Sequence, residues 1–442
     1  ANSLETRIPH TDLFARRWCV VVVVCISSPL MAALWRSLVD WNTHLFVPAM
    51  PPPPPYPTLE LHSVVLLCVH GDVVRQSPRA GPSPCLPSKR SLRVLQAGQE
   101  LFPAPDVASA PHTATMKQHH LSGAGVLQME ALGQSLQNFL VQNGILRRAS
   151  SLHEMQTTVK AFHAQSLPAA QSLQCFLYGM CPSSLSGDQK NQSQAHVEKF
   201  TIHYAQCLFD MFHPSCPRAW QRFVEVSASR HHHKKEVASE FEILAQKMGG
   251  IHGPYFVTRE ILKLYDCKGV VYPPLSATEF QRLLSLADQL AVDEFCTVVQ
   301  DKQFCRLACG LLLDYISRML AFAPSSLPSV YIFMASSSSY LSMLGTLMGD
   351  SIVGVLQSTN PPQDSLYPPA GSVLLFELFL ERGDPSKRYL RVSANGNVLH
   401  LGDFRCPYKG LCRMSAFLAK GHEGKFVCSP QEFSIMCASQ GR

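Results

Sequence analysis

The sequence predicts an α/β fold in which a central mixed, mainly parallel sheet is flanked by helices and carries an inserted helical lobe. Two continuous apolar runs, Leu59 to His70 and Val330 to Ala335, are typical of strands buried on both faces. Helical patterns separate these runs, and the pair Asn395-Gly396 is a late hairpin signal. Strands that alternate with helices and end in a hairpin indicate this class of fold.

The composition is that of a folded chain with few charges. Its 442 residues are 46% hydrophobic and 16% charged, whereas ordinary soluble domains carry about 25% charge. These values exclude a disordered chain, a coiled coil and an acidic tail protein. The net charge of +6 comes from scattered basic residues, so we expect no nucleic-acid partner.

Residues 1–58 are predicted to form an N-terminal segment that precedes a single domain over 59–442. Trp18 to Trp35 is an apolar run without a charge, and arginines flank it on both sides. Its 18 residues just cross a hydrocarbon core of about 30 Å, which predicts a signal-anchor and a membrane association. A cleaved signal peptide is the alternative, since its apolar region usually has about 7–15 residues.

These two interpretations place the protein on a membrane or in the lumen of the secretory pathway. A mitochondrial transit segment is a third interpretation, and Glu5 and Asp12 count against it. The prolines between Pro48 and Pro57 predict a stiff extended spacer before the domain.

The cysteines do not predict a metal site. No CxxC occurs among the 16 cysteines, and the pair Cys305 and Cys309 has no second pair nearby to complete a tetrahedral site. We therefore expect no metal and no cofactor. A disulfide is expected within the tail, among Cys406, Cys412, Cys428 and Cys437, if this part of the chain is lumenal.

The first half of the domain contains a long loop and then a helix. Ser77 to Pro111 is rich in proline and serine and predicts the loop. The helix begins at Leu121-Ser122, where apolar residues recur at three- and four-residue spacing: Val126, Met129, Leu132, Leu136 and Phe139. The helical lobe is expected at approximately 165–300. Its basic patch, His231 to Lys235, is interpreted as a solvated loop, with a metal or phosphate role as the alternative.

The second half supplies more helices and the remaining strands. Two amphipathic patterns, Thr278 to Ala291 and Phe304 to Phe322, predict helices. Ser336 to Ser339 are expected to form a turn that caps the next helix. Ser372 to Leu380 and Tyr389 to Leu401 predict the last strands.

Two motifs resemble the histidine acid phosphatases. Val69-His70-Gly71-Asp72-Val73-Val74-Arg75 at the end of the first buried strand resembles their RHGxRxP motif. Tyr331 to Leu347, YIFMASSSSYLSMLGTL, is similar to their strand-HD-helix segment. Further segments follow one another in the family's order: Gly125 to Gly133, SVLLFELFLE, YLRVSANGNVLHL, GLCRMSAFLA and SPQEFSIMC, the last two in the tail. The resemblance is nearest to the lysophosphatidic acid phosphatase branch and covers roughly residues 60–440 in patches.

The resemblance implies a phosphate site with a histidine nucleophile, arginines and a general acid. A phosphoryl group spreads negative charge over three oxygens, so its transfer needs several fixed cations, and planar arginine suits phosphate. A histidine nucleophile forms a covalent intermediate, and an acid must protonate the leaving oxygen.

Carried onto this sequence, the resemblance leaves most of that site empty. His70 matches the nucleophile. The arginine that the family has before this histidine is replaced by Val69, and the next arginine is replaced by Val73. The family's second histidine falls on Ser336, and its proton-donating aspartate falls on Ser337.

Two arginines remain as candidates for holding phosphate. Arg148 fits the family's distal arginine at the end of a strand after the first helix, with Arg147 as a competitor. Arg75 is a weaker candidate. The sequence thus predicts a degenerate phosphatase that serves as a binding or structural module, with no identified protein partner. The alternative is an active acid phosphomonoesterase with a phosphomonoester ligand, including lysophospholipids, and His70 as its nucleophile.

Overall fold

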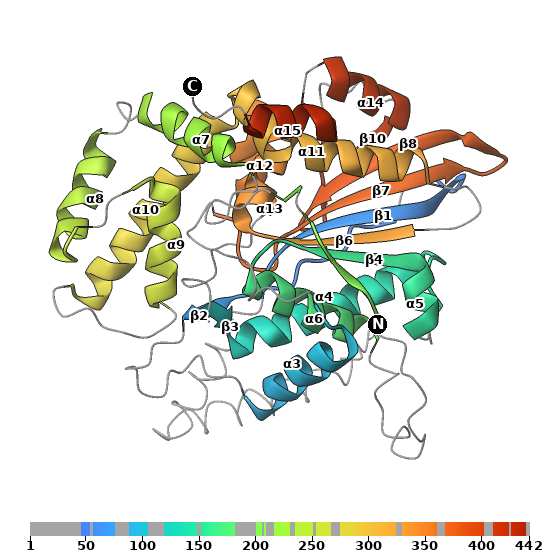
Figure 1. Ribbon diagram of the computed structural model, residues 1–442, viewed down its shortest axis with the longest axis horizontal. Coiled ribbons are helices and arrows are strands. Elements are labelled where there is room, and N and C mark those ends of the chain that lie inside the picture. The colour runs from blue at the N-terminus through green and yellow to red at the C-terminus, as the bar shows by residue number, and fades with distance from the viewer. Residues whose placement is uncertain are drawn as a thin grey trace, which may run out of the picture. The chain divides into compact units, whose positions relative to one another are not determined.

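The computed structural model divides into two compact units, Ala1–Leu45 and Phe46–Arg442. It describes residues 46–53, 56–75, 88–104, 119–147, 152–181, 200–205, 207–208, 216–229, 235–250, 253–266, 275–323, 329–359, 367–401, 410–423 and 426–438, all in the second unit (Figure 1). The apolar run from Trp18 to Trp35 and the histidines at 231–233 therefore lie outside the described residues.

An eight-stranded mixed sheet forms the centre of the second unit, in the order β10-β8-β7-β1-β6-β4-β5, with β9 paired to β8. The parallel strands are β1 (Leu59–Val69), β6 (Ser329–Ala335), β4 (Val159–His163) and β5 (Ile202–Tyr204). The strands β7 (Val373–Glu381), β8 (Asp384–Ala394), β9 (Asn397–Val398) and β10 (Leu411–Arg413) are antiparallel to their neighbours. The predicted mixed sheet is confirmed, although parallel pairing is confined to four strands.

The two buried runs lie side by side at the centre of this sheet. Residue Val69 of β1 pairs with Ala335 of β6, so both strands end at the same edge. Residues 64–69 of β1 are at most 1% exposed, which explains why the run has no polar alternation. At the hairpin, Asn395 and Gly396 have positive φ angles of 49° and 86°, as the predicted type I′ turn requires.

Helices cover both faces of the sheet (Figure 1). On one side α3 (Lys89–Leu101), α4 (Gly123–Gln142) and α6 (Leu167–Met180) pack on one another, and α6 contacts β4 and β6. On the other side α11 (Lys302–Ala321) and α12 (Ser337–Met348) contact β1. The other described elements are β2 (Val73–Arg75), β3 (His119–Leu121), α5 (Leu152–Thr158), η5 (Gly349–Ser351), α13 (Ile352–Thr359), α14 (Met414–Glu423) and α15 (Pro430–Ala438).

The helical lobe consists of α7 (Pro217–Ser229), α8 (Lys235–Lys247), α9 (Tyr255–Asp266) and α10 (Ala277–Val298) (Figure 1). A small apolar cluster of its own holds α8, α9 and α10 together. The helix α6, which the sequence placed in this lobe, instead covers the sheet. The predicted helices at 278–291 and 304–322 are present as α10 and α11.

The loop predicted for Ser77 to Pro111 is wrong over α3. The Ser88 hydroxyl caps this helix by accepting a hydrogen bond from the Ser91 amide. Its buried residues are Ser91, Val94 and Gly98, and a Cβ at Gly98 would lie 2.9 Å from the Gln174 carbonyl oxygen of α6. Because the buried face is small and packs on another helix, the sequence shows no strong apolar stripe.

The proline-rich segment is packed on the domain rather than free as a spacer. Pro48 and Pro51 are buried, and the Phe46 carbonyl accepts a hydrogen bond of 2.6 Å from Gln128 Nε2 of α4. The same nitrogen donates to the Ala370 carbonyl at 2.7 Å. Residues 46–53 therefore belong structurally to the second unit.

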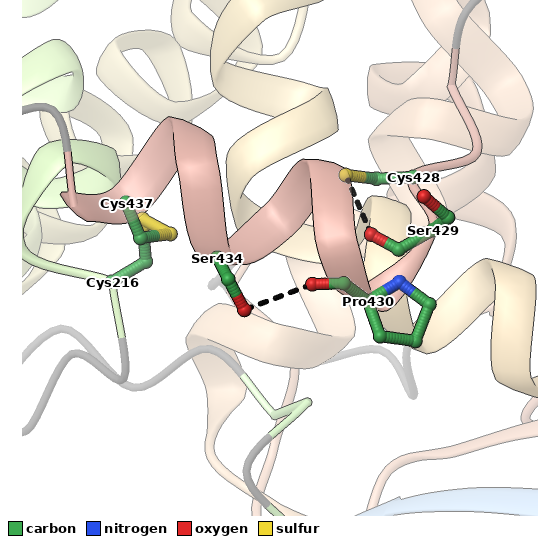
Figure 2. Close-up of a disulfide and its surroundings, with 6 residues drawn as sticks. All are labelled: Cys216, Cys428, Ser429, Pro430, Ser434 and Cys437. Carbon is green, nitrogen blue, oxygen red and sulfur yellow. Dashed lines mark hydrogen bonds between the residues drawn. A yellow bond between two sulfur atoms is a disulfide. The ribbon is translucent and has the colours of Figure 1, made fainter.

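A disulfide joins the C-terminal helix to the lobe (Figure 2). Cys437 of α15 bonds to Cys216, which immediately precedes α7 and is 221 residues away in sequence. Cys412 is also disulfide-bonded, whereas Cys428 is a free buried thiol. The tail thus contains bonded cysteines as expected, but Cys437 pairs outside the tail because α15 packs against α7.

One described helical stretch, Ser337–Thr359, has the length and mean hydropathy of a membrane span. Its most apolar window is 61% buried inside the molecule, since α12 packs between the sheet and α11. The core helix of a folded domain can have the same length and mean hydropathy, and burial of this kind is typical of such a helix.

Candidate functional site

His70 lies at the edge where β1 and β6 end. Its amide donates a hydrogen bond of 2.9 Å to the Ala335 carbonyl of β6, and its carbonyl accepts one of 3.3 Å from the Gly371 amide before β7. These bonds fix His70 between two neighbouring strands. Ligands of α/β sheets bind at such carboxyl ends, so this edge is the candidate site.

The imidazole of His70 has a defined orientation. Its Nδ1 lies 2.9 Å from the Gly71 carbonyl oxygen, which can only accept a hydrogen bond. In the neutral ring the proton therefore resides on Nδ1, and Nε2 carries the lone pair. The residue is half-buried, and Nε2 is the ring nitrogen not used in the bond to Gly71.

The loop after His70 is held by α4 and α6. The Gly71 amide donates to Ser172 Oγ of α6 at 3.0 Å, and the Ser122 hydroxyl donates to Asp72 Oδ2 at 2.9 Å. Ser122 also caps α4 by accepting a bond from the Gly125 amide, as predicted for the start of this helix. A Cβ at Gly125 would lie 2.3 Å from the Asp72 carbonyl oxygen, so the close approach requires glycine. The loop is consequently rigid.

The valines at the predicted arginine positions are part of the apolar packing. Val69 is 1% exposed within β1, and Val73 is half-buried against the core. An arginine at either position would need a different backbone path or a water-filled space to keep its charge solvated. The two valines therefore stabilise the sheet edge and cannot hold phosphate.

Neither predicted phosphate-binding arginine has a described side chain. Arg75 ends the short strand β2, and only its backbone is described, while Arg148 lies outside the described residues. The strand expected before Arg148 is not present, because residues 143–147 form a turn after α4 and β4 begins later, at Val159. Arg147 is exposed in this turn.

Serines occupy the end of β6, where the family resemblance implies a histidine and an aspartate. Ser336 follows the strand in an extended conformation, and Ser337 begins α12. The predicted cap is incomplete, because Ser336 Oγ lies 2.6 Å from Ser338 Oγ instead of bonding a backbone amide. Neutral hydroxyls can orient a ligand, but they neither neutralise phosphate nor supply a general acid at ordinary pH.

A buried charged network, absent from the sequence predictions, lies behind Ser337. Arg259 of α9 is 2% exposed, and its Nε lies 2.5 Å from Asp288 Oδ1 and its Nη1 2.9 Å from Glu260 Oε1. The guanidinium stacks on the ring of Tyr367, 3.5 Å from the centroid. Tyr367 in turn interacts with Ser337 and Glu260, and burial raises its pKa well above the ordinary value.

This network connects the lobe to the candidate site but leaves no cation free there. Arg259 is compensated by two carboxylates, and its exposure is too small for contact with a ligand. In the sequence, Arg259 looks like a polar residue of a surface helix, so no local signal identifies it. The tertiary contact of α9 with the loop before β7 buries it.

His163 at the end of β4 is a second histidine on the same edge. It is 1% exposed, its Nδ1 lies 2.7 Å from the Ala164 carbonyl oxygen, and its Nε2 has no hydrogen-bond partner among the described residues. Burial lowers the pKa of this imidazole. The sequence signal, a histidine that ends a short strand before a capped helix, was present and was missed.

Glu294 holds the start of α9 and makes the lobe sensitive to pH. Its Oε2 accepts a hydrogen bond of 3.0 Å from the Phe256 amide, and burial raises its pKa from 4.5 to about 7. Between these two values the unfolded carboxyl ionises while the folded one stays protonated, so stability falls as pH rises. The loss is complete by about pH 8, where both states are ionised, and amounts to roughly 3 kcal/mol.

We expect Glu294→Gln to remove this loss, because an amide oxygen can still accept the Phe256 bond but does not ionise. Urea unfolding at pH 5 and pH 8 should show a smaller drop in the variant than in the wild type. Glu240→Gln is the control, because Arg282 lowers the pKa of that exposed carboxyl, which is largely ionised in both states at pH 5 and pH 8, so this variant should show the same drop as the wild type. Equal drops in wild type and Glu294→Gln would contradict the prediction.

Comparison with known proteins places the fold. No family model and no curated protein sequence matches the chain. The phytase of Hafnia alvei in complex with myo-inositol hexakis sulphate superposes with a TM-score of 0.51 at 14% identity, over 85% of this chain and 98% of the phytase. The apo form of the same phytase superposes with a TM-score of 0.50 at 14% identity, over 84% of this chain and 98% of the phytase. The phytase from Citrobacter braakii gives 0.49 at 14% identity, over 84% and 100%.

The chain therefore has the fold of the histidine acid phosphatases. At 14% identity the likeness to the phytases shows the fold alone. The chemistry has to be argued from the residues at the sheet edge beside His70.

Proposed function

We propose that this protein is a non-catalytic member of the phosphatase fold, a binding or structural module whose phosphate site has been lost. The observation that carries the proposal is the end of β6, where Ser336 and Ser338 bond each other and no carboxylate or imidazole projects from the described turn. Burial of Val69 and the compensation of Arg259 by carboxylates support it.

The energetics support the same conclusion. Removing one donor that stabilises transition-state charge costs about 3–4 kcal/mol of barrier. General acid catalysis contributes roughly a further 100- to 10,000-fold. A site that lacks two arginines and the acid together should hydrolyse phosphomonoesters at a rate that His70 does not influence.

We expect the full-length protein and its His70→Ala variant to hydrolyse p-nitrophenyl phosphate equally slowly from pH 4 to pH 7. Steady-state release of p-nitrophenol measures this, and matched circular dichroism spectra exclude a folding difference. Turnover in the wild type that His70→Ala abolishes would overturn the proposal.

The alternative is a working acid phosphomonoesterase, in which His70 attacks phosphorus through Nε2. The bond from Nδ1 to the Gly71 carbonyl favours it, because this bond orients the ring and leaves Nε2 as the nitrogen available for attack. Arg148, Arg75 and an acid still to be identified would then complete the site. The lysophosphatidic acid phosphatase branch makes a lysophospholipid the substrate to assay. In this case orthovanadate should raise the melting temperature of the wild type more than that of His70→Ala, whereas in the first case the two proteins should respond equally.

For location we propose the secretory pathway, in its lumen or anchored to its membrane. The disulfide between Cys216 and Cys437 supports an oxidising compartment, and the apolar run at 18–35 supports entry into it.

A further inference from the structure

A cavity of about 360 Å³ lies at the end of the sheet remote from His70. It is lined by residues 386–389 of β8, the last residue of β10, the start of α14 and the end of α11. Phe379 of β7 pairs with Tyr389 at the cavity and with Leu61 near the start of β1, whereas His70 follows the other end of β1. At about 3.3 Å per residue, roughly 30 Å separate the two places.

Among the described residues, the cavity is lined by three cationic side chains and by no carboxylate: Lys387, Arg388 and Arg413. Lys387 is largely compensated, because its Nζ lies 3.1 Å from Glu381 Oε2 and 3.5 Å from Asp384 Oδ2 outside the lining. Arg388 donates to the carbonyls of Leu320, Ala321 and Ala323 at the end of α11. Those carbonyls fix the guanidinium but carry only partial charge, so its positive charge remains.

Arg413 supplies the second uncompensated charge. It ends β10, is exposed, and pairs with no carboxylate in the part of the chain that the structure describes. Arg388 and Arg413 both line the cavity, and a guanidinium suits a phosphate dianion because it can donate two N–H groups to it.

The rest of the described lining combines Ala321, Met414 and Leu418 with Tyr389 and the two serines Ser386 and Ser415. A small inorganic ion would leave this surface in contact with water, whereas a ligand with a hydrocarbon part would cover it. The volume is within the range of pockets that bind small organic molecules, about 300–1,000 Å³.

We propose that this cavity binds a phosphate monoester that carries a short apolar group, with Arg388 and Arg413 on the phosphate and the apolar group against Met414 and Leu418. This binding is independent of His70 and of whether the protein is a catalyst. The same headgroup occurs free in water and at the surface of a phosphatidic acid membrane, and the two sources are distinguished experimentally.

The test uses the full-length chain carrying His70→Ala, so that neither hydrolysis nor binding at the sheet's other edge contributes. Isothermal titration with hexyl phosphate, inorganic phosphate and hexanol measures the affinity, and flotation with phosphatidylcholine vesicles, with and without phosphatidic acid, measures the membrane source. We expect binding of hexyl phosphate or of vesicles that contain phosphatidic acid. If hexyl phosphate binds, the affinities for inorganic phosphate and for hexanol should each be at least about ten-fold weaker.

Arg413→Gln should weaken this binding about ten-fold, because it removes a charge-assisted contact. The matched control is Arg382→Gln, since Arg382 is an exposed arginine at the same end of the sheet that pairs with Glu60 and does not line the cavity. Loss in Arg413→Gln with unchanged binding in Arg382→Gln supports the proposal. Equal losses in the two variants, equal affinity for inorganic and hexyl phosphate, or no binding of either source overturns it.

Discussion

Replacement of Arg391 by methionine should lower the free energy of unfolding by about 3–5 kcal/mol. Arg391 of β8 and Glu377 of β7 form a two-point ion pair, with Nε to Oε2 at 2.6 Å and Nη2 to Oε1 at 2.7 Å. The side chains are 4% and 0% exposed. Burial raises the pKa of Glu377 even beside the guanidinium, so loss of Arg391 leaves a carboxyl that cannot be solvated.

Urea unfolding at pH 7 measures this loss, with two comparisons. Arg382→Met removes an exposed ion pair between the turn after β7 and Glu60 of β1, and it should cost less than about 1 kcal/mol. The double variant Glu377→Leu with Arg391→Met should recover most of the stability, because an apolar pair can replace a buried ion pair. If Arg391→Met and Arg382→Met cost the same, the buried pair is not compensating a desolvated charge.

The second large effect is expected from Cys437→Ser, which opens the disulfide to Cys216. The bridge closes a loop of 221 residues, and its removal should lower the free energy of unfolding by about 2–4 kcal/mol. The helix α15 has no buried residue of its own and is otherwise held by contacts such as the ion pair between Glu432 and Arg306 at 2.7 Å. Limited proteolysis should therefore release the C-terminal helix first.

Cys428→Ser is the matched control for this experiment. Cys428 is a free thiol that donates to the Ser429 carbonyl, a bond that a serine hydroxyl can keep (Figure 2). Comparison of variants is preferable to a reductant, because Cys412 is also disulfide-bonded. Similar denaturation midpoints for wild type and Cys437→Ser, together with a reactive Cys437 thiol in the wild type, would show that the bridge is not formed.

The candidate site was partly predictable, because its anchor is local in sequence. The run Leu59 to His70 ends in a histidine, and a buried strand must end at a sheet edge, so the position of His70 follows from the pattern. The serines after Ala335 were predictable for the same reason. The burial of Arg259 is not predictable, since it depends on α9 meeting Tyr367. His163, in contrast, ends a short strand before a capped helix, which is a local pattern that marks the same sheet edge.

The mixed sheet, its two central strands, the Asn395-Gly396 hairpin and the valines and serines at the candidate site are all predictable from the sequence. These features depend on periodicity, turn chemistry and residue identity, which are local properties. The structure adds that α3 interrupts the expected loop, that the proline segment packs on the domain and that Cys437 bonds to Cys216. It also adds that Arg388 and Arg413 line one cavity, because contacts between distant segments depend on packing, which leaves no periodic trace in the sequence.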